Sequence, residues 1–491
     1  MAVPTVYVVG VGMIPFVKPG ENDPYPMMGA RAVRAALSDA GLDYTAIQQA
    51  YAGYVYADST AGQAVLYGVG MTGIPVINVN NNCASGSTAL FLARQAVASG
   101  VVDCALAVGF EQMNPGALKG GAYSDRPSPL ASFIQVLKDH NQFDEAAPRT
   151  PQFFAAAGRA YMDEFGISPE TFGRISVKAR QHAANNPYAV FRKPATLEEV
   201  MTSPKMTDPL TRLQCCPPTC GAAAAIVCSP AFAKKHGMDM RVSIAGQAMT
   251  TDRGDAFSDD MRNLIGADMA HRAAQAVYAE AGIGPEDVDV VELHDCFTVN
   301  ELLSYEALSL TPRGTAEKFI LDGDNTYGGK VVTNPSGGLL SKGHPLGATG
   351  LAQCAELTWQ LRGQADARQE HGHRRRHAGC ERQCHEAERE QREQTHAAID
   401  ENGRYGARTP EPVRPGIARQ ERGLDGVAAD AGRQDLVEER ADHEQLGRPA
   451  EGDRVAERPH QRLPAPAADD RPDARVHDHG GRQQPRVIRR R

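Results

Sequence analysis

The feature that most constrains the fold of this 491-residue chain is an internal duplication. RAVRAALSDAGLDYTAIQQA at 31–50 aligns with RAAQAVYAEAGIGPEDVDVV at 272–291, and each copy predicts a helix that ends at a glycine before a strand. A second pair follows in the same order, since CASGSTALFL at 83–92 aligns with HPLGATGLAQ at 344–353. Two matches in one order indicate two copies of a single α/β unit.

The second alignment places two reactive residues at equivalent positions. Cys83 stands opposite His344, and Gly86 stands opposite Gly347. If the copies pack about a pseudo-twofold axis, the two helix starts meet and His344 can act as a base for Cys83. A helix N-terminus would also lower the pKa of the Cys83 thiol. The alternative is that Cys83 is a small core residue. That role is expected for three other cysteines, Cys104, Cys228 and Cys354.

Apolar runs predict the strands. The Val-rich run at 101–113 is typical of a strand buried on both faces. The runs CGAAAAIVCSP at 220–230 and MRVSIAGQAMTT at 240–251 predict two more, and shorter strands are expected at 50–57 and 289–295. Strands that alternate with helices predict a layered α/β architecture.

The composition changes abruptly after Gly363. From Gln364 to Arg491 the chain has no Lys, Phe, Met or Trp, and Arg, Glu, Ala, Gln, Asp, Gly and Pro dominate. A segment this polar cannot bury enough apolar surface to offset its ordering entropy, so we expect it to be disordered. It is either a natural charged segment or the out-of-frame translation of a GC-rich gene, because the missing residue types have AT-rich codons.

The duplication also predicts what the second copy lacks. The strand at 101–113 follows the first Cys-bearing helix, so its equivalent should lie near 362–374. The sequence there, RGQADARQEHGHR, cannot form a buried strand. We therefore expect the second copy to stop before its last sheet strand.

These observations divide the chain into five segments, of which the Gly- and Pro-rich one with helical patches is a loop domain. The segments are the first part of the N-terminal half at 1–113, the loop domain at 114–210, the return strands of the N-terminal half at 211–265, the C-terminal half at 266–363, and the tail at 364–491.

Charge and composition argue against several classes of function. The net charge of −8 gives no basic field for nucleic acid. No apolar run reaches the ~18 residues of a membrane span, and the start MAVPTVYVVGVGMIPF lacks the basic region of a signal peptide. Ten scattered cysteines indicate free thiols in a reducing compartment, so we expect a cytoplasmic protein. The zinc-type side chains at 371–385 are expected by chance in a tail rich in His and Arg, so we expect no metal site.

Three segments carry side chains suited to acyl transfer, each at an expected element boundary. They are NNNCASGSTAL at 80–90, VELHDCFTVNE at 291–301 and TNPSGGLLSKGHPLGATG at 333–350. In the second segment, Cys296 lies next to His294 and offers a second thiol that can move a proton at a carbon centre.

Residues of about 5–363 resemble the thiolase superfamily, and more narrowly the sterol-carrier-protein-x and bacterial lipid-transfer-protein thiolases. The segment around Cys83 resembles the nucleophile motif, HDCF at 294–297 the subgroup signature, and GHPLGATG at 343–350 the histidine motif. The resemblance implies a five-layered αβαβα sandwich of two similar halves, a loop domain and a homodimer.

The resemblance also implies a reaction, the thiolysis of a 3-oxoacyl-CoA by coenzyme A, often with branched or sterol-derived chains. No bound metal or redox cofactor is implied, and coenzyme A is a co-substrate. Cys83 would take up the acyl group as a thioester, and His344 would deprotonate it. Cys296 would be the acid and base at the α-carbon, and His294 would contribute to the oxyanion hole.

The sequence departs from the family in two places. Family members end with a strand and a glycine-rich loop that donates to the acyl-enzyme oxyanion, but QADARQEHGHRRRHAG at 364–379 has no such loop, so we expect activity to be impaired. Cys220 replaces an acidic residue common in relatives. Two other functions stay open. One is a non-catalytic carrier of lipid or acyl-CoA. The other is condensation or steroid side-chain retro-aldol chemistry, for which Cys83 would be dispensable.

Overall fold

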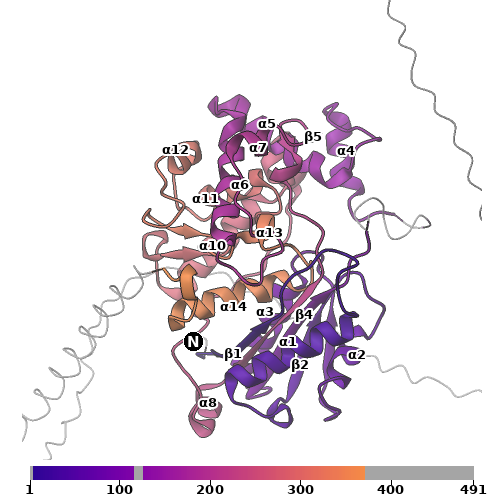
Figure 1. Cartoon of the computed structure of the whole chain (residues 1–491), viewed down its shortest axis with the longest axis vertical. Coiled ribbons are helices and arrows are strands. Elements are labelled where there is room, and N and C mark those ends of the chain that lie inside the picture. The colour runs from indigo at the N-terminus through magenta and orange to yellow at the C-terminus, as the bar shows by residue number, and fades with distance from the viewer. Residues whose placement is uncertain (1–3, 116–124, 126, 371–491) are drawn as a thin grey trace, which may run out of the picture. The chain divides into compact units, whose positions relative to one another are not determined.

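A five-stranded sheet forms the first half of the fold (Figure 1). The computed structural model describes residues 4–115, 125 and 127–370. The strand order is β1-β7-β4-β2-β3, in which β3, β2 and β4 run parallel and β7 is antiparallel to both β4 and β1. The strands are β1 (Tyr7–Met13), β2 (Gln49–Gly53), β3 (Val76–Val79), β4 (Cys104–Glu111) and β7 (Gly221–Cys228).

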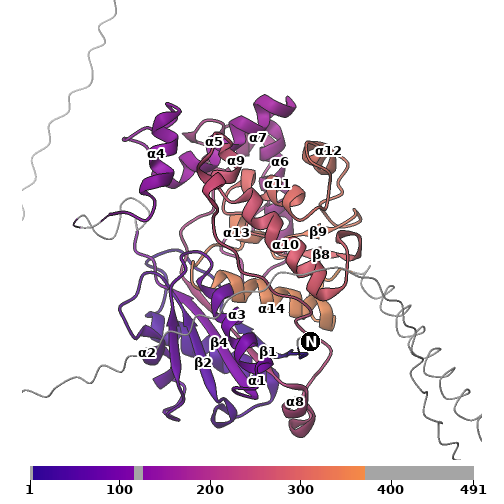
Figure 2. The ribbon, with the colours of Figure 1, turned by 180° about the vertical axis from the view of Figure 1, so that it is seen from behind.

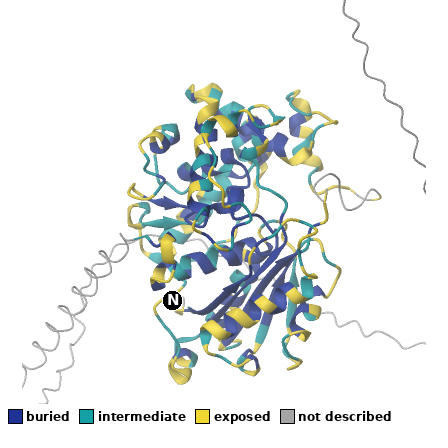
Figure 3. Ribbon diagram, viewed as in Figure 1, coloured by how far each residue is buried: buried dark blue, intermediate teal, exposed yellow. Residues whose placement is uncertain are grey.

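The two central strands are buried on both faces, as their apolar runs predict. All residues of β4 and β7 are buried (Figure 3). Cys104 pairs in register with Cys228, and both are fully buried, which confirms their expected core role. Because side chains alternate along a strand, Leu106 faces one core and its neighbour Ala107 the other.

Helices cover both faces of this sheet, and they belong to both halves of the chain. On one face lie α1 (Tyr25–Ala40) and α2 (Ala61–Tyr67), and on the other lie α3 (Ser85–Ala98) and α14 (Thr349–Arg362). Figures 1 and 2 show α3 and α14 side by side between the first sheet and the second half. The expected layered architecture is confirmed, with α14 as the middle-layer helix from the second copy.

The helix ends of the duplicated unit form as the glycines predict. Helix α1 ends at Gly41 (φ 62°), and α10 (Ala267–Ala281) ends at Gly282 (φ 69°). Both glycines are left-handed, a conformation that costs glycine little. The duplicated helices therefore stop at equivalent positions.

The second sheet is much smaller than the first. Within residues 4–115, 125 and 127–370 it consists of β8 (Val290–Val291) and β9 (Val332–Thr333), which pair in parallel as β2 and β3 do. No strand follows α14 up to residue 370, so the predicted absence of the last strand is confirmed that far. Residues 371–374 of that prediction, the zinc-like run at 371–385 and the rest of the tail lie outside the described residues.

The prediction of a strand at 240–251 is wrong. Val242 and Ile244 exchange backbone hydrogen bonds of 3.0 Å with Val8 and Val6 at the start of β1, but no regular strand forms. The reason follows from the first sheet, where β1 pairs with β7 and β7 pairs with β4. The segment at 240–251 is the counterpart of β1, and the described part of the second copy offers it no counterpart of β7.

Helix α10 also differs from its equivalent in the first copy, because the described second copy has no counterpart of β7. Its equivalent α1 buries seven residues against β1 and β7, whereas α10 fully buries Ala274 alone. Apolar positions such as Met269, Val277 and Tyr278 are only half-buried. The outer helix of the second half thus lacks, within the described residues, the sheet that its equivalent covers.

Residues 364–370 correct the expectation of disorder from Gln364 onward. Ala365 is fully buried, and the Arg368 guanidinium pairs with the Glu356 carboxylate of α14 at 3.0 Å with both side chains buried. The Gln369 amide donates to the Gln360 carbonyl at 2.9 Å. Polar side chains can be buried where they pair with polar side chains, which a count of apolar residues does not detect.

Further helices and a small hairpin lie between β4 and β7 and in the second half. The inserted elements are α4 (Ala131–Asp139), α5 (Arg149–Phe165), α6 (Pro169–Ala183), α7 (Leu197–Met201), β5 (Lys205–Thr207) and β6 (Leu210–Thr211). The later helices are α8 (Pro230–His236), α9 (Met261–Leu264), α11 (Thr298–Ala307), α12 (Ala316–Leu321) and α13 (Gly338–Ser341). None of the described helices has the length and apolarity that crossing a membrane requires.

Glycines bring the two copies into backbone contact. A Cβ at Gly86 would lie 2.6 Å from the carbonyl oxygen of Gly347, and a Cβ at Gly109 would overlap the same oxygen. Near a twofold axis a residue contacts its own equivalent. Gly86 and Gly347 are equivalents, so their contact marks the pseudo-twofold axis that the duplication predicts.

We expect Gly109→Ala to destabilise the protein by about 1–3 kcal/mol, because its Cβ would overlap a backbone oxygen that cannot move without shifting the His344 loop. Gly254→Ala is the matched control, since a Cβ there meets nothing within 4 Å. Urea denaturation of both variants measures the difference. Equal midpoints would contradict the close packing of the two copies at this point.

Candidate active site

Cys83 lies in a tight turn between β3 and α3. The preceding residue, Asn82, has a φ of 49°, and Cys83 stands two residues before Ser85, the first residue of the helix. The Asn81 N–H donates to the Ser85 hydroxyl at 2.9 Å, and that hydroxyl donates to the Asn82 carbonyl at 2.7 Å. These bonds fix the turn that presents the half-buried thiol at the helix start.

His344 is held at two points in the loop between α13 and α14. Its backbone N–H donates to the Thr219 hydroxyl at 2.6 Å, and its Nδ1 lies 2.7 Å from the Thr349 hydroxyl. That hydroxyl donates its one proton to the Pro345 carbonyl at 2.9 Å, so it must accept from Nδ1. The proton of the neutral imidazole is therefore on Nδ1, and Nε2 carries the free lone pair.

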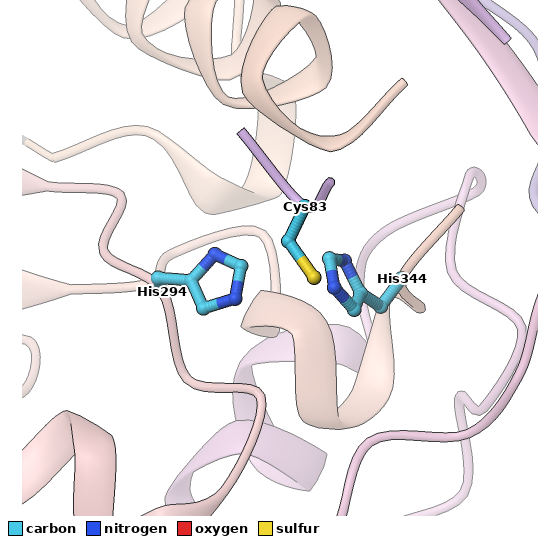
Figure 4. A group of neighbouring side chains, drawn as sticks. All are labelled: Cys83, His294 and His344. Carbon is cyan, nitrogen blue, oxygen red and sulfur yellow. The ribbon is translucent and has the colours of Figure 1, made fainter. Parts of the chain in front are cut away.

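This lone pair faces the thiol. His344 is 4% exposed, and its Nε2 has no hydrogen-bond partner among the described residues. One donor atom from each of Cys83, His294 and His344 lies within 4.8 Å of the others. Figure 4 shows the sulfur of Cys83 between the two imidazole rings. The convergence of Cys83 with His344, predicted from the duplication, is thus observed.

His294 completes the group from the segment before α11. Its ring stands edge to face with that of His344, with centroids 5.0 Å apart. The Asn300 side chain donates to the His294 carbonyl and holds the backbone. Burial lowers the pKa of His294 to about 4, so its ring is neutral at pH 7 and carries one N–H donor.

Cys296 lies close to this group but outside it. The thiol is 6% exposed, and the Cys296 carbonyl accepts the backbone N–H of Cys216 at 2.8 Å. Burial raises the pKa of Cys296 well above its usual range, and Cys216 and Cys83 raise it further. The Cys296 side chain is therefore a neutral thiol at pH 7.

Two buried groups tie the segment of His294 to the loop of His344. The Asp295 carboxyl group accepts the backbone N–H groups of Leu339 (2.7 Å) and Leu340 (3.3 Å) in α13, and burial raises its pKa to about 8. The Lys342 ammonium pairs with the buried Glu292 carboxylate at 3.1 Å. These bonds hold the two imidazoles in one arrangement.

Burial decides the protonation of the Cys83–His344 pair. It raises the pKa of Cys83 to about 11 and, with His294 and Lys342, lowers the pKa of His344 well below its usual value. The expectation that the helix N-terminus lowers the thiol pKa is therefore wrong, because desolvation outweighs it. The resting pair is a thiol and a neutral base.

Cys83, His294 and His344 each carry a sulfur or nitrogen atom of the kind that binds zinc. The thiol and the Nε2 lone pair are also a nucleophile and a base, and the His344 tautomer suits a general base.

Two residues that hold His344 could not be named from the sequence with the same ease. Thr349 lies within the GHPLGATG motif, where helical spacing could have suggested it as a partner of His344. Thr219 gives no such sign, because tertiary packing alone brings it to the loop. Cys216, which lies in the run QCCPPTC, contacts the backbone of Cys296 and also has no local signal.

The structure explains Cys220. The side chain is fully buried, accepts the Met113 N–H at 3.2 Å and donates to the Met113 carbonyl at 3.4 Å. A thiol can do both, whereas a carboxylate could only accept and would stand near the buried Glu111.

Comparisons with known proteins agree with this geometry. Residues 6–230 match the family described as "Thiolase, N-terminal domain", and residues 253–379 match "Thiolase C-terminal domain-like". The chain belongs to the thiolase family. Sterol carrier protein 2 of Gallus gallus is 53% identical over 375 residues, which cover 75% of this chain and 68% of the relative. Benzoylsuccinyl-CoA thiolase subunit BbsB of Thauera aromatica is 39% identical over 73% of this chain and 89% of its own length.

Solved structures show the same thiolase fold. The Ltp2-ChsH2(DUF35) aldolase is 27% identical, with a TM-score of 0.62 over 74% of this chain and 91% of that one. Human mitochondrial 3-ketoacyl-CoA thiolase is 20% identical, with a TM-score of 0.55 over 74% of this chain and 93% of that one. The second likeness concerns the fold alone.

We expect Thr349→Val to lower the reactivity of Cys83 about 10–100-fold, because the variant removes the acceptor that keeps the His344 proton on Nδ1. Thr349→Ser keeps the hydroxyl and is the matched control. The rate of Cys83 alkylation by iodoacetamide, followed by peptide mass spectrometry, measures the effect. Equal rates in the two variants would show that the tautomer is fixed by another group.

We also expect no Cys83 thiolate between pH 6 and 9. A pKa of about 11 lies above this range, so the thiol stays protonated throughout it. The measurement is thiolate absorbance near 240 nm in the wild type minus that in Cys83→Ser, which cancels the other cysteines. A Cys83-dependent signal at pH 7 would instead indicate a thiolate–imidazolium pair.

Proposed function

We propose that the protein transfers acyl groups between coenzyme A thioesters through an acyl-enzyme on Cys83. The observation that carries the proposal is the buried Nε2 of His344, which has no hydrogen-bond partner among residues 4–115, 125 and 127–370 and lies in the group with the Cys83 thiol. A base in this tautomer next to a thiol is what nucleophilic acyl transfer needs. A carrier of lipids needs neither group.

The reaction that fits the family is thiolysis of a 3-oxoacyl-CoA. His344 Nε2 takes the Cys83 proton as the sulfur attacks the 3-oxo carbon, and a neutral His294 N–H donates to the thioester oxygen of the substrate. The bond between C2 and C3 breaks, the acyl group remains on Cys83, and Cys296 protonates the acetyl-CoA carbanion. The Cys296 thiolate then takes the thiol proton of coenzyme A, whose sulfur attacks the Cys83 thioester. The shortened acyl-CoA is released, and His344 returns its proton to the Cys83 sulfur. The reverse sequence is a condensation.

The substrates we propose are 3-oxoacyl-CoA esters from fatty acids or sterol side chains, in keeping with relatives named sterol carrier protein 2. Coenzyme A is a co-substrate, and the steps above use no metal or redox cofactor. We also propose a cytoplasmic homodimer that works with other proteins of lipid metabolism. The glycine-rich oxyanion loop of the family would follow residue 370, outside the described residues, and its loss would slow the acyl-enzyme step about 10²–10³-fold.

Two observations favour other functions. The relatives named as sterol carrier or lipid-transfer proteins favour a non-catalytic carrier. The 27% likeness to a structure named as an aldolase favours retro-aldol chemistry, for which a steroid side chain is the substrate we consider. The carrier predicts binding without acylation, and the aldolase predicts activity without Cys83.

We expect acetyl-CoA or a 3-oxoacyl-CoA to add one acyl group to the full-length protein, seen as an increase in intact mass. Cys83→Ala should abolish the adduct, because the nucleophile is gone. Cys354→Ala, a half-buried cysteine of α14, is the control and should keep it. An unmodified wild-type protein that still binds acyl-CoA would support the carrier. Turnover that survives in Cys83→Ala would support the aldolase.

A further inference from the structure

Glu111 is a buried carboxylate to which the reaction above gives no role. It is the last residue of β4, fully buried, after seven residues without an ionisable carboxyl or amine. Burial of an isolated carboxylate is unfavourable, so a carboxylate at this position needs strong hydrogen bonds.

Its hydrogen bonds join the two halves of the protein. Its Oε1 accepts the backbone N–H of Tyr56 at 2.8 Å, and its Oε2 accepts those of Val55 at 3.1 Å and Gly347 at 3.0 Å. Val55 and Tyr56 follow β2 in the first half. Gly347 lies in the His344 loop of the second half, in contact with Gly86 at the start of the Cys83 helix.

We propose that Glu111 is a positioning residue whose ionised carboxylate clamps the Gly347 N–H to the first half and thereby holds His344 Nε2 against the Cys83 thiol. The effect of Glu111 on acyl transfer rests on the proposed function. The clamp acts through the loop, since Glu111 is fully buried and would not touch the substrate.

An ionised carboxylate is the form of Glu111 that suits all three N–H groups, because both oxygens accept and the negative charge strengthens each bond. A protonated acid or an amide carries no charge and presents a donor in place of one acceptor. If the donor takes the place of Oε2, it faces the N–H groups of Val55 and Gly347, and if it takes the place of Oε1, it faces that of Tyr56. Protonation of Glu111, or Glu111→Gln, therefore weakens the hold on the Gly347 N–H in either orientation, since the charge is lost in both.

The clamp is sensitive to pH near neutrality. Burial raises the pKa of Glu111 to about 7, against the lowering effect of its three N–H donors. The titratable groups facing it are Tyr56 after β2, Cys83 before α3 and Cys220 before β7. The pKa of each of these is raised, so all three are neutral at pH 7. His344 is also neutral there, because its pKa is lowered. Among these groups Glu111 alone changes charge near pH 7, and the clamp closes as pH rises through that value.

The experiment compares Glu111→Gln with the wild type and with Glu21→Gln, a control at an exposed position. The first readout is the rate of Cys83 alkylation by iodoacetamide in the full-length protein from pH 5.5 to 8.5, which needs no acyl-CoA. We expect the rate in the wild type and in the control to show a step near pH 7, in addition to the steady rise that a thiol with a pKa of about 11 gives over this range. We expect Glu111→Gln to be slower by about 10–100-fold at pH 8 and to lack that step. In acyl transfer, kcat should fall while KM stays unchanged.

Several results would overturn the proposal. These are a Glu111→Gln profile equal to the wild type, a step near pH 7 that persists in the variant, or a wild-type profile without that step. The last result needs no variant, so the proposal stays testable even if Glu111→Gln does not fold, which circular dichroism would show. If acyl-CoA never acylates the wild type, the proposed function fails, but the alkylation profile still decides the role of Glu111.

Discussion

The contact between Gly86 and Gly347 is the constraint on which the rest of the site depends. Each residue lies at or just before the start of a middle-layer helix, and a side chain on either would overlap backbone of the other half. Because the two backbones touch, the turn that carries Cys83 and the loop that carries His344 meet at one point. Reactive groups are thus placed by backbone packing, which is stiffer than placement by long side chains.

Burial of this meeting point determines the chemistry of the pair. Desolvation disfavours charge on both partners, so it raises the pKa of Cys83 and lowers that of His344. A charged pair would be pre-activated but costly to bury, whereas a neutral pair moves its proton only when a substrate is attacked. The Thr349 hydroxyl makes this possible, because it places the imidazole proton on the nitrogen that faces away from the thiol.

The sequence predicted the parts of the fold that depend on local pattern or on symmetry. The glycine stops, the buried strands β4 and β7, and the meeting of Cys83 with His344 follow from residue types and from the duplication. Single-sequence patterns could not show that Thr219 or Glu111 reaches the His344 loop, because those contacts join residues more than a hundred positions apart. Nor could composition show that Arg368 is buried, since its partner Glu356 lies a few turns away.

The segment at 240–251 does not form the predicted strand, which shows that an apolar run forms a strand only where a neighbouring strand can pair with it. In the first half β4 supports β7, and β7 supports β1, so the strands form a chain of dependence from the centre outward. The described second half contains the counterparts of β2 and β3 but not of β4, so its sheet stops at β8 and β9. The residues that hold Cys83, His294 and His344 come from the turn before α3, α3 itself, the segment before β7, α13, α14 and the segment before α11, none of which belongs to the lacking part. The geometry of these three side chains therefore does not require the second sheet to be complete, whereas the burial of α10 does.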